Sequence, residues 1–407
     1  MKIPELLVPA NNVEVLKVAV MYGADAVYIG GEAFGLRSGA KNATLEELRE
    51  GIEFAHARRV KVYVTANILA HDRDLTGIRQ YFHDLKDVKP DALIISDPGV
   101  FMIAKQVCPE IDIHISTQAN NTNYETYLFW WQMGAKRVVA ARELSLQELT
   151  EIRAQVPEEL EIEVFGHGAM CISYSGRCLL SNFLTGRDAN QGSCTHPCRW
   201  KYAVMEETRP GEYFPIEENE RGTFIFNSKD LCMIDHLPDL VRTGIDSIKI
   251  EGRMKTALYV ATVTRAYRMA LDALQDGEDV YDAHREWYKS EVGKCTNRQF
   301  TTGFFYGKPT EKDQIYDSAT YVTDYIYIGM SEGFDDDGLV PMVQKNKFSV
   351  GDKVEILRHD GANLAATVLE IRDDDGNPME SAPHAKQSLH VRFSATPDLY
   401  DIIRKEA

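Results

Sequence analysis

The sequence lacks any long apolar run. Hydrophobic residues make up 44% of its 407 residues, but the longest apolar stretches are short, such as ELLVPA at 5–10 and DALIISD at 91–97. A helix that spans a bilayer needs roughly 20 apolar residues, and the N-terminus begins directly with a strand-like run rather than a leader. We therefore expect a soluble, unprocessed protein with no membrane segment. The length exceeds what one barrel or sheet needs, which predicts two domains.

Positive charge is also scarce. The 62 Asp and Glu residues outnumber the 45 Lys and Arg residues, giving a formal net charge of -17. This excludes a generally basic protein that coats nucleic acid, although a local basic patch remains compatible with it. Acidic loops such as 333–338 and 372–377 are most simply solvated turns. Internal repeats beyond a strand–helix rhythm and low-complexity segments are absent too.

The seven cysteines do not form the paired C-x2-C knuckles of zinc ribbons. An odd number of cysteines in a long chain without a leader indicates a reducing compartment, so we expect a cytoplasmic protein. The motifs of two peptidase classes are missing as well. The chain has no H-E-x-x-H pair for a zinc protease and no nucleophile in a serine-protease context.

What is present, between residues 1 and 276, is a regular alternation of short apolar runs with helical patterns. Eight such units in about 275 residues predict a closed (β/α)8 barrel, which takes about 250 residues. Spacing alone does not show closure, so an open doubly wound sheet is the alternative. Thr44 before Glu47, and Ser145 before Glu148, have the capping-box spacing of helix starts. The expected strands are 5–10, 25–31, 60–68, 91–97, 112–119, 136–144, 161–168 and 246–253.

Polar residues just past each barrel strand are candidates for the active site, because barrels carry their chemistry at the carboxyl ends of the strands. His114, Ser116 and Gln118 alternate along one strand, so all three can face the interior. A histidine buried in the core is the alternative for His114. The residues that follow strands are Glu32, Arg37, Asn67, Asp97, His114, Ser116, Gln118, Arg142, Glu143, His167, Lys249, Glu251 and Arg253.

The alternation breaks once, in an insertion at 166–227 between strand seven and a helix expected to begin near Ser228. A connection of this length is commonly functional. Beyond the barrel we expect a linker with a helix at 277–319. Alternating strands between turns then predict a small all-β, β-barrel-like domain at 320–407.

Four of the cysteines lie in this insertion, spaced C-x6-C-x15-C-x3-C within 28 residues. Four thiolates suit either a tetrahedral zinc or a 4Fe-4S cluster, and the spacing does not choose between them. Unrelated reduced thiols are the third interpretation. Cys232 is a possible additional ligand, whereas Cys108 and Cys295 are expected to be ordinary buried or loop thiols. The four candidate metal ligands are Cys171, Cys178, Cys194 and Cys198.

The insertion also carries a recognisable signature. Glu163-Val-Phe, Gly168-Ala-Met-Cys171, Gly176-Arg-Cys178 and Leu180-Ser181 reproduce E-x-F-x-x-G-A-[LIVM]-C-x4-G-x-C-x-[LIVM]-S. On this signature the chain resembles the collagenase-like peptidase family U32, over roughly residues 3 to 275. The phrases NQGSCTHPCRWKY and NSKDL are most similar to those of the family's tRNA 5-hydroxyuridine synthesis proteins.

This resemblance implies hydroxylation of a tRNA wobble uridine without O2, with prephenate as the hydroxyl source and a 4Fe-4S cluster as cofactor. It also implies that Cys171, Cys178, Cys194 and Cys198 are the cluster ligands. Hydroxylation of ribosomal RNA or of a quinone precursor, a peptidase, and a zinc-stabilised binding module are the alternatives. A thiol activated by His167 or His196 would suit a peptidase, but crowded thiols suit ligands better.

Substrate contacts are assigned by charge and shape. Arg37, Arg142, Lys249 and Arg253 are candidates to hold a small dicarboxylate such as prephenate, although each has a carboxylate nearby with which it can pair. Arg177, Arg199 and Trp200 are candidates to contact RNA, with Trp200 packing the loop onto the barrel as its alternative role. The catalytic residue is not assigned; the candidates are His114, Gln118, Glu163 and His167.

Overall fold

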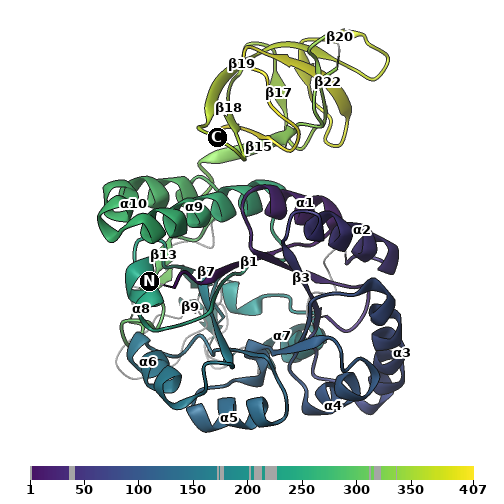
Figure 1. Cartoon of the computed structure of the whole chain (residues 1–407). Coiled ribbons are helices and arrows are strands. Elements are labelled where there is room, and N and C mark those ends of the chain that lie inside the picture. Colours follow the sequence, from purple (N-terminus) through teal and green to yellow (C-terminus); the bar gives the residue numbers. More distant parts are fainter. Residues whose placement is uncertain are drawn as a thin grey trace.

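A closed barrel of eight parallel strands forms the body of the protein (Figure 1). The computed structural model describes residues 2–35, 42–171, 174, 178–200, 203–205, 213–215, 227–310, 313–315, 322–335 and 337–407. The strand order is β12-β1-β2-β3-β4-β5-β6-β7, and β12 also pairs with β7, which closes the ring. The predicted (β/α)8 barrel is confirmed, and the open doubly wound sheet is excluded.

Each barrel strand is followed by a helix that covers the outside of the ring. The strands are β1 (Glu5–Pro9), β2 (Ala26–Gly30), β3 (Lys61–Ala66), β4 (Ala92–Ile95), β5 (Asp112–Ile115), β6 (Arg137–Val139), β7 (Glu161–Ala169) and β12 (Ser247–Ile250). The helices are α1 (Val13–Met21), α2 (Leu45–His56), α3 (Asp72–Val88), α4 (Pro98–Val107), α5 (Tyr124–Gln132), α6 (Leu146–Gln155), α8 (Leu237–Arg242) and α9 (Ala257–Asp276).

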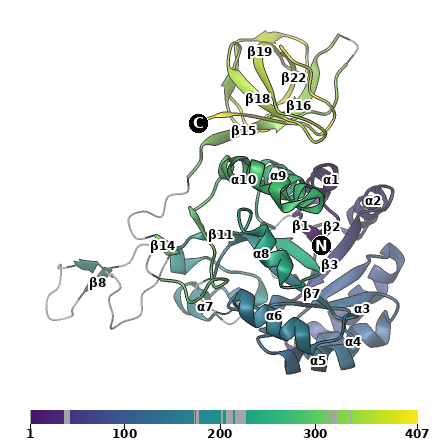
Figure 2. The same cartoon turned by 60° about the vertical axis from the view of Figure 1, so that its left-hand side comes forward.

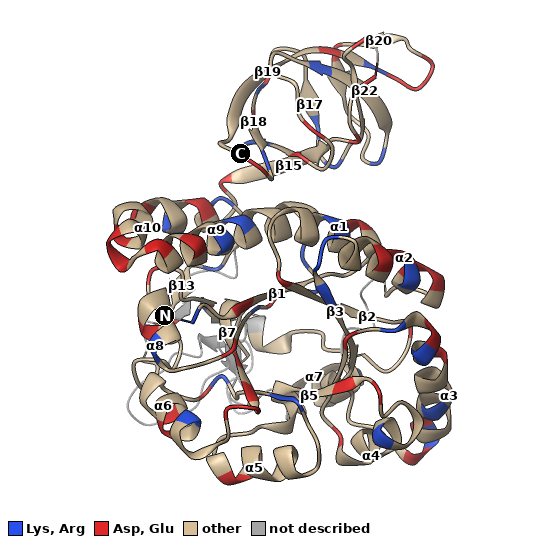
Figure 3. Cartoon of the chain, viewed as in Figure 1, with Lys and Arg blue, Asp and Glu red and all other residues tan. Residues whose placement is uncertain are grey.

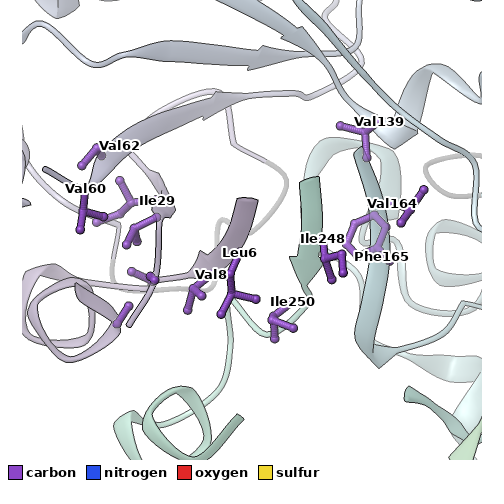
Figure 4. Packing of buried hydrophobic residues seen from close by; sticks show 14 of the residues in the cluster. Leu6, Val8, Ile29, Val60, Val62, Val139, Val164, Phe165, Ile248 and Ile250 are labelled. Carbon is purple, nitrogen blue, oxygen red and sulfur yellow. The ribbon is translucent and has the colours of Figure 1, made fainter. Parts of the chain in front are cut away.

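The two-residue period of the strands separates an outer core from the barrel interior. Leu6, Val8 and Ile250 belong to the large cluster between strands and helices, and Figure 4 shows them together on one side of β1 and β12. Both expected capping boxes are present: the Thr44 side chain accepts from Glu47 N, and the Ser145 side chain accepts from Glu148 N. Local sequence therefore fixes where α2 and α6 begin.

The barrel interior is divided into an apolar part and a charged part. Leu7, Ala26, Tyr28, Tyr63, Ala92 and Ile94 form a separate apolar cluster. Next to this cluster, Arg137 of β6 lies 5.4 Å from the Tyr63 ring and forms ion pairs with Glu5, Glu161 and Glu163. Barrel interiors are usually filled by branched apolar side chains, so a buried ion network is unusual. The cost of removing these charges from water must be offset by the ion pairs between them.

The insertion changes the sheet as well as the loop. β11 (Asp230–Cys232) pairs antiparallel with the end of β7, and β13 (Phe300–Thr301) pairs with β11. The expected helix start near Ser228 is wrong, because the chain first adds this strand and α8 begins only at Leu237. The other insertion elements are α7 (Leu180–Thr185), the 3-10 turns Ala189–Gln191 and Pro197–Arg199, β8 (Ala203–Met205), β9 (Tyr213–Pro215) and β10 (Asn227–Ser228). Figure 2 shows β8 away from the barrel.

The segment at 277–319 holds elements that pack on the barrel body. Helix α10 (Glu278–Gly293) lies against α9, and the side chain of Tyr281 in α10 donates to the carbonyl of Ile234 at 2.7 Å. Strand β14 (Gln314–Ile315) pairs with β10. The predicted helix of this segment is therefore present. No helix in the described part of the chain is long and apolar enough to cross a membrane.

The C-terminal region is the all-β domain that the sequence predicts. The alternation at 320–393 indicates the other strands of its main sheet, whereas the central strand β23, which lies between β15 and β18, follows that stretch and was not expected. Tyr22, directly after α1, donates to the carbonyl of Leu357 at 2.6 Å, and Arg404 of β23 pairs with Glu291 of α10 at 2.5 Å, so the domain docks against the barrel's outer helices. Its strands are β15 (Tyr325–Met330), β16 (Val340–Val343), β17 (Phe348–Ser349), β18 (Lys353–Leu357), β19 (Leu364–Arg372), β20 (Pro378–Met379), β21 (Ser381–Ala382), β22 (Ser388–Phe393) and β23 (Ile402–Glu406).

Gly168 provides a test of the β7 geometry. Its φ is 111°, and a Cβ there would overlap the backbone carbonyl of Glu251. We expect Gly168→Ala to lower the free energy of unfolding by about 3 kcal/mol, because a strained φ and a backbone clash add. Gly186 is the matched control, since its φ is 69° but no atom lies within 4 Å of the added Cβ. Gly186→Ala should cost about 1 kcal/mol. Equal losses in urea denaturation would contradict this account.

Candidate active site

The carboxyl ends of the barrel strands enclose one pocket of about 150 Å³. It is smaller than the roughly 300–1,000 Å³ of typical sites for drug-sized ligands. Eight of the residues singled out from sequence as metal, catalytic or substrate-binding candidates line it. They are Gln118, Arg142, Cys171, Cys178, Cys194, Cys198, Lys249 and Arg253. Asn67, Ser116 and Glu251, which were expected at strand ends, line it as well.

The cysteine-bearing insertion is tied to the barrel by backbone and amide contacts. Leu69, in the loop after β3, donates its N–H to the carbonyl of Asn190 at 3.3 Å, and its own carbonyl accepts from Gln191 Nε2 at 2.5 Å. Within the insertion, the fully buried Ser181 hydroxyl bonds the carbonyl of Arg187 and the hydroxyl of Thr195. These contacts hold the thiol-bearing loop over the mouth of the barrel.

The four thiols share the pocket, which is the first requirement of a common ligand set. Cys171 is exposed and the other three are half-buried, and Cys194 Sγ accepts from His196 N at 3.4 Å. Among the described residues, no three His, Cys, Asp or Glu side chains lie close enough together to hold a metal ion. The type and number of donors fit a four-thiolate group.

Lys249 is positioned by a carboxylate beneath the pocket. Its ammonium donates to Glu163 Oε1 at 2.8 Å, while Arg137 Nη1 donates to Glu163 Oε2 at 3.0 Å. Glu163 is completely buried and does not line the pocket, so its contacts are those of a residue that orients Lys249. Burial alone would raise the pKa of Glu5, but Arg137 outweighs it and the pKa is lowered. The ion pairs with Arg137 therefore favour the charged form of Glu5.

The two arginines at the pocket are held by different partners. Arg253 donates from Nη1 to Thr65 Oγ1 at 2.9 Å and from Nη2 to Asn42 Oδ1 at 2.8 Å. Both acceptors are neutral side-chain oxygens, and the two bonds orient the guanidinium at the pocket. Arg142 donates to the carbonyl of Ala169 at 2.7 Å, stacks over the Phe165 ring at 3.9 Å and lies 3.6 Å from a Glu251 oxygen.

Gln118 and His114, which the sequence places on one face of β5 and its extension, occupy different environments. Gln118 lines the pocket, and its Oε1 is buried without a hydrogen-bond partner in the described part of the chain. His114 lies deeper and packs edge-on against Tyr63, with ring centroids 4.6 Å apart. Burial, with Arg137 and Lys249 nearby, lowers its pKa well below the usual value. His114 is therefore a neutral core histidine.

His167 lies outside the pocket because β7 bulges. The pairing between β12 and β7 shifts by one residue after Lys249, so that His167 rather than Gly166 opposes Ile250. The imidazole packs among Tyr259, Tyr267 and Phe300. Burial lowers its pKa to about 4.

The remaining cysteines are separate from the four pocket thiols. Cys232 of β11 is buried, and burial raises its pKa to about 12. It pairs in register with His167 and does not line the pocket. Cys108 and Cys295 are buried thiols, as predicted.

The other RNA and substrate candidates stand apart from the pocket or outside the described residues. Trp200 is 47% exposed and is not among the pocket-lining residues. Arg37 and Arg177 lie outside the described residues, and for Arg199 only the backbone is described. The sequence analysis missed Tyr28 and Phe165 as pocket walls, although both alternate with outward-facing residues on their strands. That period-two pattern is the signal that would have found them.

Comparison with known proteins connects this site to a family. The profile described as peptidase family U32 matches residues 11–315, and that of the family's C-terminal domain matches residues 323–404. A relative from Bacillus subtilis named tRNA hydroxylation protein P1 is 42% identical over 400 residues, which cover 98% of this chain and 93% of that protein.

Two relatives from Escherichia coli are also similar. One named tRNA hydroxylation protein P is 39% identical, covering 93% of this chain and 91% of that protein. A second, named 23S rRNA 5-hydroxycytidine C2501 synthase, is 37% identical and covers 66% of this chain and 39% of that protein.

The lowered pKa of His167 predicts acid sensitivity. The unfolded chain binds a proton below about pH 6.5 and the folded chain only near pH 4, so stability falls as the pH drops through this window. We expect His167 to account for a loss of about 2 kcal/mol between about pH 7.5 and about pH 5. His167→Phe, which keeps an aromatic ring in the site, should reduce the pH dependence of urea unfolding by that amount. An unchanged pH dependence would refute the assignment.

Proposed function

The chain belongs to peptidase family U32, and from this premise we propose that it is an RNA-modifying enzyme that hydroxylates C5 of a tRNA wobble uridine without O2. The observation that carries the proposal is the pocket in which four thiols, three cationic side chains and the amide of Gln118 meet. The relatives named for tRNA hydroxylation cover nearly the whole chain.

The chemistry of the pocket argues against the peptidase interpretation. A cysteine peptidase needs a base beside its thiol, and His167 is enclosed by aromatic rings and does not line the pocket. His196 does line it, but it shares the wall with four thiols rather than one. Four thiols are the donor set of a metal group and exceed what nucleophilic catalysis requires.

For the cofactor we propose a 4Fe-4S cluster held by Cys171, Cys178, Cys194 and Cys198, with zinc as the alternative. Such a cluster supplies one-electron chemistry when bound. The protein itself would contribute the loop that closes the barrel mouth and the bonds that anchor it through Leu69 and Ser181. The half-buried position of three of the thiols would limit their access to water.

For the hydroxyl donor we propose prephenate, bound through its carboxylates. Arg253 is oriented at the pocket by bonds to Thr65 and Asn42, and Arg142 is fixed by the Ala169 carbonyl and the Phe165 ring. Arginine matches a carboxylate with two parallel hydrogen bonds. Lys249 is partly neutralised by Glu163, so it would donate a hydrogen bond to the bound carboxylate but add little net positive charge to the pocket.

The cluster proposal predicts the effect of a single thiol substitution. Protein purified without oxygen should be brown and absorb visible light, and Cys194→Ser should lose most of that absorption together with bound iron. Cys108→Ala is the control, because Cys108 is buried at the end of α4 and does not line the pocket. A colourless wild-type protein with one zinc per chain would overturn the cluster proposal.

The tRNA proposal predicts a change in cellular nucleosides. In a strain that lacks this protein and any redundant hydroxylase, mass spectrometry should find no 5-hydroxyuridine derivatives in tRNA. The wild-type gene should restore them, and Arg253→Lys should restore them at least about 10-fold less, because lysine cannot reproduce the paired bonds to Thr65 and Asn42. Unchanged tRNA with altered ribosomal RNA would move the proposal to the ribosomal substrate.

A further inference from the structure

Helix α7 carries an exposed apolar surface at the edge of the pocket. Leu179, Phe183 and Leu184 are 71%, 85% and 41% exposed, and we refer to these three side chains as the α7 ridge. We propose that the α7 ridge is the docking surface for unpaired RNA bases next to the target nucleotide, with Phe183 as the stacking side chain. This inference rests on the proposed function and adds to it the surface that holds the RNA.

The ridge is continuous with the pocket. Leu180, beside Leu179 in the chain, lines the pocket, and Ser181 is completely buried. Two residues later Phe183 faces solvent. Thr195 N donates to Ser181 Oγ at 3.1 Å, so α7 is fastened to the segment that bears Cys194 and Cys198. Figure 1 shows α7 within the outline of the helix ring. A base in the pocket would have its neighbours beside this helix.

The charge of the surrounding segment suits RNA. Between residues 170 and 202 the sequence has four basic residues, Arg177, Arg187, Arg199 and Lys201, against the single acidic residue Asp188. This is a local excess in a chain whose formal charge is -17. Elsewhere, Figure 3 shows several acidic residues along outer helices such as α10. The Arg187 side chain is exposed directly after α7. Phosphates are attracted to such a segment and repelled by the rest of the surface.

The reaction itself creates a need for stacking. A base must leave its stack to enter a pocket at the mouth of the barrel. The neighbouring bases then lose a stacking partner, which an aromatic side chain replaces without regard to sequence. Phe183 is an aromatic side chain of this kind, and its 85% exposure leaves its ring open to a base.

The test is binding of a labelled RNA hairpin, with the anticodon sequence in its loop, to the purified full chain by fluorescence anisotropy. We expect Phe183→Ala to weaken binding roughly 5- to 100-fold and Phe183→Trp to retain it. Phe129→Ala is the matched control, because Phe129 is 51% exposed on α5, outside the insertion. Since Phe183 is 85% exposed, its two substitutions should leave thermal unfolding unchanged.

Salt dependence separates stacking from charge. Phe183→Ala should weaken binding at every salt concentration without changing the slope of log K against log salt. Arg187→Ala should reduce that slope by about one phosphate contact. The same RNA as a fully paired duplex should bind Phe183→Ala and wild type alike, because a duplex offers no unstacked bases.

Two results would overturn the proposal. One is hairpin binding by Phe183→Ala as tight as that of wild type. The other is a self-associating wild type that Phe183→Ala makes monomeric with RNA binding unchanged, which would assign the ridge to a second copy of the chain. Failure of the tRNA assignment is distinguishable, since the nucleosides of the deletion strain would then be normal whatever the Phe183 variants do in the binding assay.

Discussion

The central physical constraint of this barrel is the buried carboxylate of Glu163. It accepts from Arg137 at 3.0 Å and from Lys249 at 2.8 Å, and all three residues are almost completely shielded from water. An unpaired charge in such a place would cost several kcal/mol, so each member requires the others. Because the three come from β6, β7 and β12, the network stabilises the part of the ring where the barrel closes. It also fixes Lys249 at the floor of the pocket.

The pocket depends on two parts of the chain, the closed ring of strands and the insertion after β7. The strands bring Gln118, Arg142, Lys249 and Arg253 to one end of the barrel, and the insertion brings the four thiols over them. The C-terminal domain docks beside α1, α9 and α10 rather than across the strand ends, as Figure 1 shows, and leaves the mouth to the insertion. The division separates the barrel scaffold from the segment that carries the four thiols.

Much of the barrel could be predicted because its signals are local. Apolar strands, capping boxes and strand-end polar residues are each readable within a few positions, and they located eight strands and most of the pocket. The misses depend on distant pairing. β11 is defined by its partner β7, about sixty residues away, and the bulge that moves His167 out of the pocket exists only against β12. The central position of β23 could not be predicted, because a charged residue such as Arg404 is not expected in a buried strand. Arg404 is neutralised there by Glu291 and Glu355 from elsewhere in the chain.

The central claim is that one pocket at the barrel mouth holds both the thiol ligands and the RNA base. The most direct measurement is a cryo-electron microscopy structure of the anaerobically purified protein bound to a substrate tRNA. We predict an extruded uridine in the pocket near Gln118, metal density among the four cysteines and neighbouring bases at Phe183. RNA bound on another face, with the pocket free of any base, would contradict it.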